Sequence, residues 1–122
     1  MLKCILIVDD NAVIRRTLRT IFEQEGWKVC GEAGNGREAI DKAHELHPDL
    51  IILDLSMPVM NGLEAAPQLR KILPHVPILV FSVYANTLPE QEAEAAGITA
   101  VISKADNTRT LVRMARDLLQ AA

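Results

Sequence analysis

The sequence contains few cysteines and few aromatic residues, and it has no excess of basic charge. Its 122 residues include two Cys, two Phe, one Trp and one Tyr, and 13 basic against 16 acidic side chains give a formal charge of −3. Neither a C-x-x-C pair nor a Cys/His metal spacing is present, which argues against a zinc site and a disulfide-rich secreted framework. We expect Cys4 and Cys30 to be buried free thiols in a reducing compartment. The slight acidity argues against non-specific binding to nucleic acid.

Long hydrophobic runs are also missing. No apolar stretch approaches the ~20 residues that a membrane-spanning helix requires, and the amino terminus lacks the pattern of a signal peptide. Both absences favour a cytoplasmic protein. The apolar fraction of 49% and the charged fraction of 24% are typical of a globular domain, and 122 residues can bury a core of their own. We therefore expect one domain over residues 1–122.

Short apolar runs alternate with longer segments of helical periodicity, which predicts an α/β protein with parallel strands joined by helices. Four runs are hydrophobic throughout, as strands covered on both faces must be: 4–8, 50–53, 78–81 and 100–102. The more polar segment 27–30 is a predicted fifth strand nearer an edge of the sheet. Five helices are predicted between and after the strands: over 12–25, from 35 to before Pro48, from 61, over 87–97 and from 108.

Three predicted helices begin with Asn or Thr followed three residues later by Glu, at Asn35, Asn61 and Thr87, a pattern that indicates capping boxes. Pro67 lies inside the third predicted helix and is expected to kink it. The fourth predicted helix has Leu88 as its only large apolar residue. Because so little anchors this helix, we expect it to be a moving part of the domain.

Polar residues follow four of the predicted strands: Asp9 and Asp10, Asp54, Ser82 and Lys104. In an open α/β sheet, ligands bind beyond the carboxyl ends of the strands. Each of these residues alone has an ordinary interpretation as a helix cap, a turn residue or a solvated charge. Together, however, three carboxylates on neighbouring strand ends repel one another, which implies a bound cation.

Oxygen ligands without Cys or His nearby favour Mg²⁺, an ion that keeps several waters and accepts phosphate oxygens. A carboxylate can attack phosphorus to form an aspartyl phosphate, while a cation, an ammonium and a hydroxyl stabilise the charge on the phosphoryl oxygens. Asp54, Lys104 and Ser82 fit the roles of nucleophile, ammonium and hydroxyl.

Four motifs, in order along nearly the whole chain, resemble the receiver domain of two-component response regulators: ILIVDDN at 5–11, DLSMPVMNG at 54–62, FS at 81–82 and SK at 103–104. The resemblance implies a flavodoxin-like, doubly wound sheet of five parallel strands in the order 2-1-3-4-5, with five helices. It also implies a phosphoacceptor signalling switch that catalyses only its own phosphorylation and dephosphorylation and turns over no separate substrate.

By this resemblance, Asp54 accepts a phosphoryl group from a phosphohistidine on a sensor histidine kinase or a phosphotransfer protein. Asp10, Asp54 and the backbone carbonyl of Ser56 would hold Mg²⁺, with Asp9 acting largely through a bound water. The resulting change in the surface formed by the fourth and fifth strands and helices would control an output.

The resemblance also gives roles to Lys104, which would pair with the phosphoryl group, and to Ser82, which would swing in to hydrogen-bond it. Two departures from the family pattern affect this part of the site. Ala105 follows Lys104 where the family usually has Pro in a cis peptide, and since non-proline cis bonds are costly the geometry of this peptide stays open. Val101 stands where many members have Tyr or Phe, so the usual coupling of hydroxyl to aromatic side chain cannot operate in its familiar form.

The segments FSVY at 81–84 and KAD at 104–106 are most similar to receivers that precede a LuxR-type helix-turn-helix. A stand-alone receiver and a part of a longer regulator both stay open. Contact with DNA is expected only through an output domain that this chain does not contain.

Charged side chains away from the strand ends have ordinary interpretations. Arg15, Arg16 and Arg19 are interpreted as a solvated face of the first predicted helix, with kinase docking as the minority interpretation. The Glu-rich fourth helix and the arginines of the fifth helix, at 109, 113 and 116, could pair across a homodimer. Exposed pairs of this kind contribute little each.

Three alternative functions have their own sequence requirements. A phosphate-independent binding module of the same fold is compatible with Val101 and Ala105, but every acidic and basic residue of the phosphoryl site is present. A Mg²⁺ phosphohydrolase with an Asp nucleophile would need Asp-x-Asp after the first strand, whereas Asn11 follows the pair Asp9-Asp10. An FMN carrier would need a Ser/Thr phosphate loop at that same position, where the two carboxylates would repel the phosphate.

Overall fold

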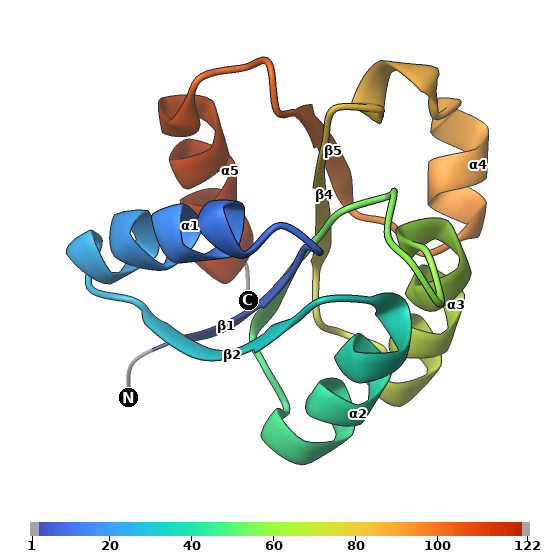
Figure 1. Ribbon diagram of the computed structural model, residues 1–122, viewed down its shortest axis with the longest axis horizontal. Helices are drawn as coiled ribbons and strands as arrows, with labels where there is room; N and C mark the ends of the chain where they lie inside the picture. The colour runs from blue at the N-terminus through green and yellow to red at the C-terminus, as the bar shows by residue number, and fades with distance from the viewer. Residues whose placement is uncertain (1–2, 121–122) are drawn as a thin grey trace.

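The computed structural model describes residues 3–120 as a five-stranded parallel sheet with helices on both of its faces (Figure 1). The strands lie in the order β2-β1-β3-β4-β5, which confirms the predicted doubly wound, flavodoxin-like topology. In chain order the elements are β1 (Cys4–Val8), α1 (Ala12–Gln24), β2 (Lys28–Ala33), α2 (Gly36–Leu46), β3 (Leu50–Leu53), α3 (Gly62–Ile72), β4 (Ile78–Ser82), the 3₁₀ turn η1 (Ala85–Thr87), α4 (Glu90–Ala95), β5 (Ala100–Ser103) and α5 (Thr108–Gln120). Within residues 3–120, no helix is both long and apolar enough to cross a membrane.

The sheet separates two hydrophobic layers. On one face α1 and α5 cover the sheet, and Phe22 and Leu111 are fully buried there. On the other face α2, α3 and α4 cover it, with Leu69 and Ala93 in the buried layer (Figure 1). The three inner strands, β1, β3 and β4, therefore contact helices on both sides. This double burial explains why their sequences are hydrophobic throughout instead of alternating.

Asn35 and Asn61 cap α2 and α3 as predicted, but only one of the three predicted capping boxes forms completely. The Asn61 side chain accepts from the Glu64 amide, and the Glu64 carboxylate accepts from the Asn61 amide, so the capping box of α3 is complete. In α2 only half of the pattern forms, because the Glu38 carboxylate accepts from the Gly34 amide instead of the Asn35 amide. The helix α3 continues as one element through Pro67.

The start of α4 differs from the prediction. Thr87 does not cap the helix; it ends the 3₁₀ turn η1, and its hydroxyl donates to the carbonyl of Tyr84. Instead α4 begins at Glu90 with Pro89 as its N-cap. A residue before proline is disfavoured in the helical region, and Leu88 is accordingly extended, which separates η1 from α4. The result is a short helix of six residues preceded by an irregular segment.

Cys4 and Cys30 form a disulfide in the structure, so the expectation of two buried free thiols is wrong. Both residues are partly exposed. The register of β2 against β1 shifts between Ile5 and Leu6, where Cys30 is the extra residue of a β-bulge. The two Cα atoms lie 5.5 Å apart, a separation typical of disulfides. The sequence did not indicate this pairing because it depends on which strand lies beside β1 and in which register.

Candidate functional site

Three carboxylates lie together at the carboxyl ends of two neighbouring strands. Asp9 and Asp10 follow β1, Asp54 follows β3, and one oxygen from each lies within 4.8 Å of the others. Asp9 and Asp54 are only 2% and 5% exposed, whereas Asp10 is exposed. The structure thus brings together the three acidic residues that the sequence placed on two neighbouring strand ends, because β1 and β3 pair directly.

Lys104 follows β5, which is an edge strand of the sheet, and its side chain reaches this cluster. Its Nζ lies 2.6 Å from Asp9 Oδ2 and 3.3 Å from Asp54 Oδ2. The peptide between Lys104 and Ala105 is trans, since no cis bond occurs among the described residues. The Lys104 amide donates to the carbonyl of Ser82 at 3.0 Å, which continues the pairing of β5 with β4 past the strand ends. The ammonium therefore reaches the carboxylates with a trans peptide after Lys104.

One ammonium faces two buried carboxylates, and the pKa shifts reflect this imbalance. Burial, together with the charge of Asp54, raises the pKa of Asp9 despite its hydrogen bonds from Lys104 and the Asn11 amide. Burial alone would lower the pKa of Lys104, but the hydrogen bond and charge of Asp9 and the charge of Asp54 outweigh it and raise that pKa. The cluster thus retains unneutralised negative charge, which a cation would offset.

The backbone of Asp9 is held by β2 and by Arg15. Its amide donates to the carbonyl of Ala33 at 3.0 Å, and its carbonyl accepts from Arg15 Nη1 at 2.6 Å. Glu32 on β2 in turn pairs with Arg15 at 2.9 Å and with Arg19 at 2.8 Å. Burial would raise the pKa of Glu32, but the hydrogen bonds from these two arginines outweigh it and lower that pKa.

The arginine pair corrects the expectation of a solvated face on α1. Arg15 and Arg19 are partly buried and engaged with Glu32, whereas Arg16 is exposed. The only signal in the sequence was their four-residue spacing on α1, because their partner lies on another element. Arg15 is thus a positioning residue for Asp9 that sequence reasoning missed.

The loop after β3 fixes the orientation of Asp54. Its Oδ1 accepts from the Leu55 amide at 2.8 Å, and the Leu55 carbonyl accepts from the Gly62 amide at 3.0 Å. A Cβ at Gly62 would overlap the Asp54 carbonyl oxygen, so only glycine permits this approach. Between these residues the Met60 amide donates to the Pro58 carbonyl across Val59, whose φ is +67°. A positive φ is unusual for a β-branched residue and shows that the loop is tightly constrained.

Ser82 and Ser56 are the other two residues that the sequence predicted for this site. Ser82 is fully buried at the end of β4, and its hydroxyl accepts from the Tyr84 amide at 3.1 Å. Within residues 3–120, no hydrogen bond joins Ser82 to Asp54. Ser56 is exposed two residues beyond Asp54. Together with Tyr84 and Leu88, it lines a cavity of about 460 Å³ between the loop after β3 and the segment that leads into α4.

Comparison with known proteins agrees with this geometry. The sequence model of the response regulator receiver domain matches residues 5–116. The chemotaxis protein CheY of Thermotoga maritima is 43% identical over 102 residues, which cover 84% of this chain and 85% of CheY. The response regulator protein VraR of Staphylococcus aureus is 35% identical over 113 residues, 92% of this chain but 54% of VraR. A solved two-component response regulator of the LuxR family from Aurantimonas sp. superposes with a TM-score of 0.88 at 27% identity, over 98% of this chain and 86% of that one.

The fold and its acidic strand ends are those of a response-regulator signalling domain. The chain belongs to the response regulator receiver domain family, which the family model and the CheY relative both show. The neighbours include regulators of the LuxR family, in agreement with the resemblance expected from the sequence. The chain spans most of the length of CheY but about half the length of VraR.

Proposed function

We propose that this receiver domain is a phosphoacceptor switch in which Asp54 takes a phosphoryl group from a phosphohistidine of a sensor histidine kinase or phosphotransfer protein. The observation that carries this proposal is the convergence of three carboxylates and one ammonium at the carboxyl ends of β1, β3 and β5. Membership of the receiver family supports the same role.

Mg²⁺ is the metal that this donor set fits best, because all the donors are hard oxygens and the cluster carries excess negative charge. Asp10, Asp54 and the Ser56 carbonyl would hold the ion, with Asp9 acting through a bound water. When bound, it supplies positive charge that offsets the repulsion between the carboxylates and the phosphoryl oxygens. The exposed position of Asp10 leaves the solvent side open to the waters that Mg²⁺ retains.

The transfer itself needs few protein groups. An oxygen of Asp54 attacks the phosphorus, an O–P bond forms, and the P–N bond of the donor breaks with its electron pair passing to the imidazole nitrogen. The Leu55 amide holds Asp54 Oδ1 in place, and Lys104 moves from its 3.3 Å contact with Oδ2 to the phosphoryl oxygens. Attack by water on the acyl phosphate later returns free Asp54 and inorganic phosphate. No separate substrate is turned over.

Ser82 links the phosphoryl group to the segment before α4. Its hydroxyl now accepts from the Tyr84 amide, and it must turn toward Asp54 to donate to a phosphoryl oxygen. This turn moves the backbone that carries Tyr84 and η1. Because Val101 offers no aromatic side chain to follow the movement, the change is transmitted by the loop and α4 themselves.

The partners follow from the same role. A sensor histidine kinase or phosphotransfer protein supplies the phosphoryl group, and any contact with DNA would be made by a separate output domain. A homodimer could join the exposed glutamates of α4, at 90, 92 and 94, to the exposed arginines of α5, at 109, 113 and 116. We propose a cytoplasmic location for this receiver, where it would meet the phosphohistidine of its donor.

The test is the intact mass of the protein after incubation with Mg²⁺ and acetyl phosphate. We expect the wild type to gain one phosphoryl group, while Asp54→Asn and an EDTA control gain none. If Mg²⁺ binds but no adduct forms even at short sampling times, the proposal fails. In that case the phosphate-independent binding module, which Val101 and Ala105 made conceivable, becomes the better explanation.

A further inference from the structure

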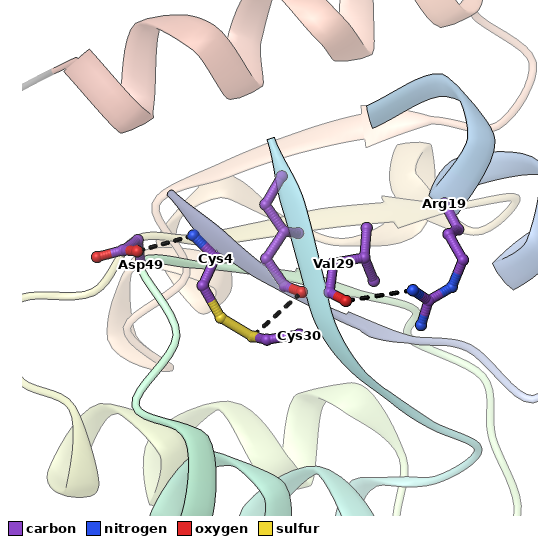
Figure 2. The surroundings of a disulfide bond; sticks show 6 residues. Cys4, Arg19, Val29, Cys30 and Asp49 are labelled. Atoms are coloured by element: carbon purple, nitrogen blue, oxygen red, sulfur yellow. Dashed lines mark hydrogen bonds between the residues drawn. A yellow bond between two sulfur atoms is a disulfide. The ribbon is translucent and has the colours of Figure 1, made fainter. Parts of the chain in front are cut away.

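The Cys4–Cys30 disulfide lies at the opposite end of β1 from the acidic cluster. Cys4 begins β1 and Asp9 follows its last residue, so the strand joins the two places directly. Figure 2 shows the disulfide crossing from β1 to the edge strand β2, near Asp49, whose carboxylate accepts from the Cys4 amide at 2.8 Å. The bond therefore fastens an edge strand to its only neighbour in the sheet.

Neither cysteine of the pair is buried in the core of the domain. Cys4 and Cys30 are partly exposed, and Cys30 is the extra residue of a bulge on an edge strand. Bulges at sheet edges are places where pairing is already interrupted. Disulfides in a reducing cytoplasm, where the proposed function places this protein, are usually transient and redox-sensing instead of structural.

In the reduced form the Cys30 thiol would have a hydrogen-bond acceptor close by. Cys30 Sγ lies 3.6 Å from the carbonyl oxygen of Ile5, within reach of a weak hydrogen bond that only the protonated thiol can donate (Figure 2). Breaking the disulfide therefore leaves Cys30 with an acceptor on β1.

The strand β2 connects this pair to the candidate phosphoryl site. Three residues beyond Cys30, the Ala33 carbonyl accepts from the Asp9 amide at 3.0 Å. Glu32 holds Arg15, which donates to the Asp9 carbonyl at 2.6 Å. Both backbone polar groups of Asp9 thus depend on the position of β2.

We propose that Cys4 and Cys30 form a reversible thiol–disulfide site, oxidised by glutathione disulfide or a similar small disulfide, which fastens β2 to β1 and thereby holds Asp9 in place. One cysteine thiolate attacks glutathione disulfide, which forms a mixed disulfide and releases one glutathione. The other thiolate attacks the protein sulfur of that mixed disulfide and releases the second glutathione. Two electrons pass from the protein thiols to glutathione, and the two thiol protons end on the released glutathione molecules. The link to Asp9 affects signalling only through the function proposed above.

The experiment uses the full chain equilibrated in buffers of varied glutathione to glutathione-disulfide ratio. After acid quenching and alkylation, intact mass gives the fraction of the pair that is oxidised, and we expect one reversible transition within the accessible range of ratios. Amide hydrogen exchange at Asp9 should then be about tenfold faster in the reduced form. Neither readout requires phosphoryl transfer, so failure of the phosphoacceptor function would leave both results intact.

A matched control amide lies near the opposite edge of the sheet from β2. The Lys104 amide also donates to a strand-end carbonyl at 3.0 Å, that of Ser82, and its exchange should not change with the redox state. The double variant Cys4→Ser, Cys30→Ser should exchange at Asp9 like the reduced wild type in every buffer. The proposal is overturned if the pair stays fully reduced or fully oxidised across the whole range, or if Asp9 exchanges equally fast in both states.

Discussion

Asp9 and Asp54 are fixed by contacts with several other parts of the chain, whereas the segment that follows Ser82 is fixed by fewer. The two carboxylates follow strands buried on both faces, and their positions are fixed by Lys104, by Arg15 and by the loop that closes at Gly62. The segment after Ser82 is a 3₁₀ turn and a six-residue helix. Exposed side chains such as those of Val83 and Tyr84 dominate its start.

This difference separates two tasks within one small domain. A reactive carboxylate needs a fixed geometry and close charges, which the inner strands supply. A signal needs a segment whose rearrangement requires little free energy, and the only residue that α4 buries is the small Ala93, followed by its buried C-cap Ala96. The following substitutions and the binding of Mg²⁺ test this contrast between a fixed acidic end and a movable β4–α4 segment.

Lys104→Met should have the largest effect, because it removes the cation that stabilises the phosphoryl oxygens. We expect the rate of phosphoryl acceptance from acetyl phosphate to fall by about 100-fold or more. Mg²⁺ should bind more tightly, since the competing ammonium at 2.6 Å from Asp9 is gone. Time-resolved intact mass measures the rate and calorimetry the affinity, with Lys71→Met on the exposed face of α3 as the control. A rate within a few-fold of wild type would contradict this role.

Gly62→Ala should distort the fixed end directly. The new Cβ would overlap the Asp54 carbonyl oxygen, so the loop must shift, and we expect a loss of about 2–3 kcal/mol in the free energy of unfolding. Urea denaturation measures it. Gly34→Ala is the matched control, because its nearest contacts would lie at 3.7 and 3.8 Å and it should change stability little. Equal stabilities of the two variants would show that Gly62 does not position Asp54.

Mg²⁺ should stabilise the wild type by about 2.7 kcal/mol at a concentration 100 times its Kd. Asp10→Asn should lose most of this gain while keeping the contacts of Lys104 with the other two carboxylates. Thermal unfolding with and without Mg²⁺ tests this, and Asp41→Asn on the exposed face of α2 serves as the control. The metal assignment fails if Asp10→Asn responds to Mg²⁺ as the wild type does.

Glu32→Gln should have the smallest effect, about 1 kcal/mol or less, because the carboxylate is partly exposed. The pKa of Glu32 is lowered in the fold, so its contribution to stability is present above the unfolded pKa near 4.5 and is lost as pH falls through the lower, folded value. The variant should therefore be less stable than wild type at pH 7 and nearly equal to it under strongly acidic conditions. Unfolding curves of both proteins over this pH range measure the difference in their free energies of unfolding. If that difference does not change with pH, the ion pair is not its cause.

Much of the fixed end could be predicted from the sequence. Continuous apolar runs identified the inner strands because burial on both faces leaves no polar alternation. The parallel arrangement then brought Asp9, Asp54 and Lys104 to one edge. The predicted start of α4 at Thr87 was wrong, because the capping pattern there competes with the restriction that Pro89 imposes on Leu88.

Contacts across the sheet could not be predicted in the same way. The disulfide between Cys4 and Cys30 depends on a bulge that shifts the register of β2 by one residue. Arg15 holds Asp9 only because Glu32 lies beside it on the neighbouring strand. Such pairings join residues far apart in the chain, and local propensity carries no information about them.

The contrast between the two regions is tested most directly by amide chemical shifts of the Mg²⁺-loaded protein, recorded before and after addition of beryllium fluoride as a phosphoryl mimic. We predict large shifts in residues 82–98 and at Lys104, with small shifts in the strand residues of β1 and β2. Binding of the mimic with equal shifts throughout the sheet, or with none in residues 82–98, would contradict the account of a fixed acidic end and a movable β4–α4 segment.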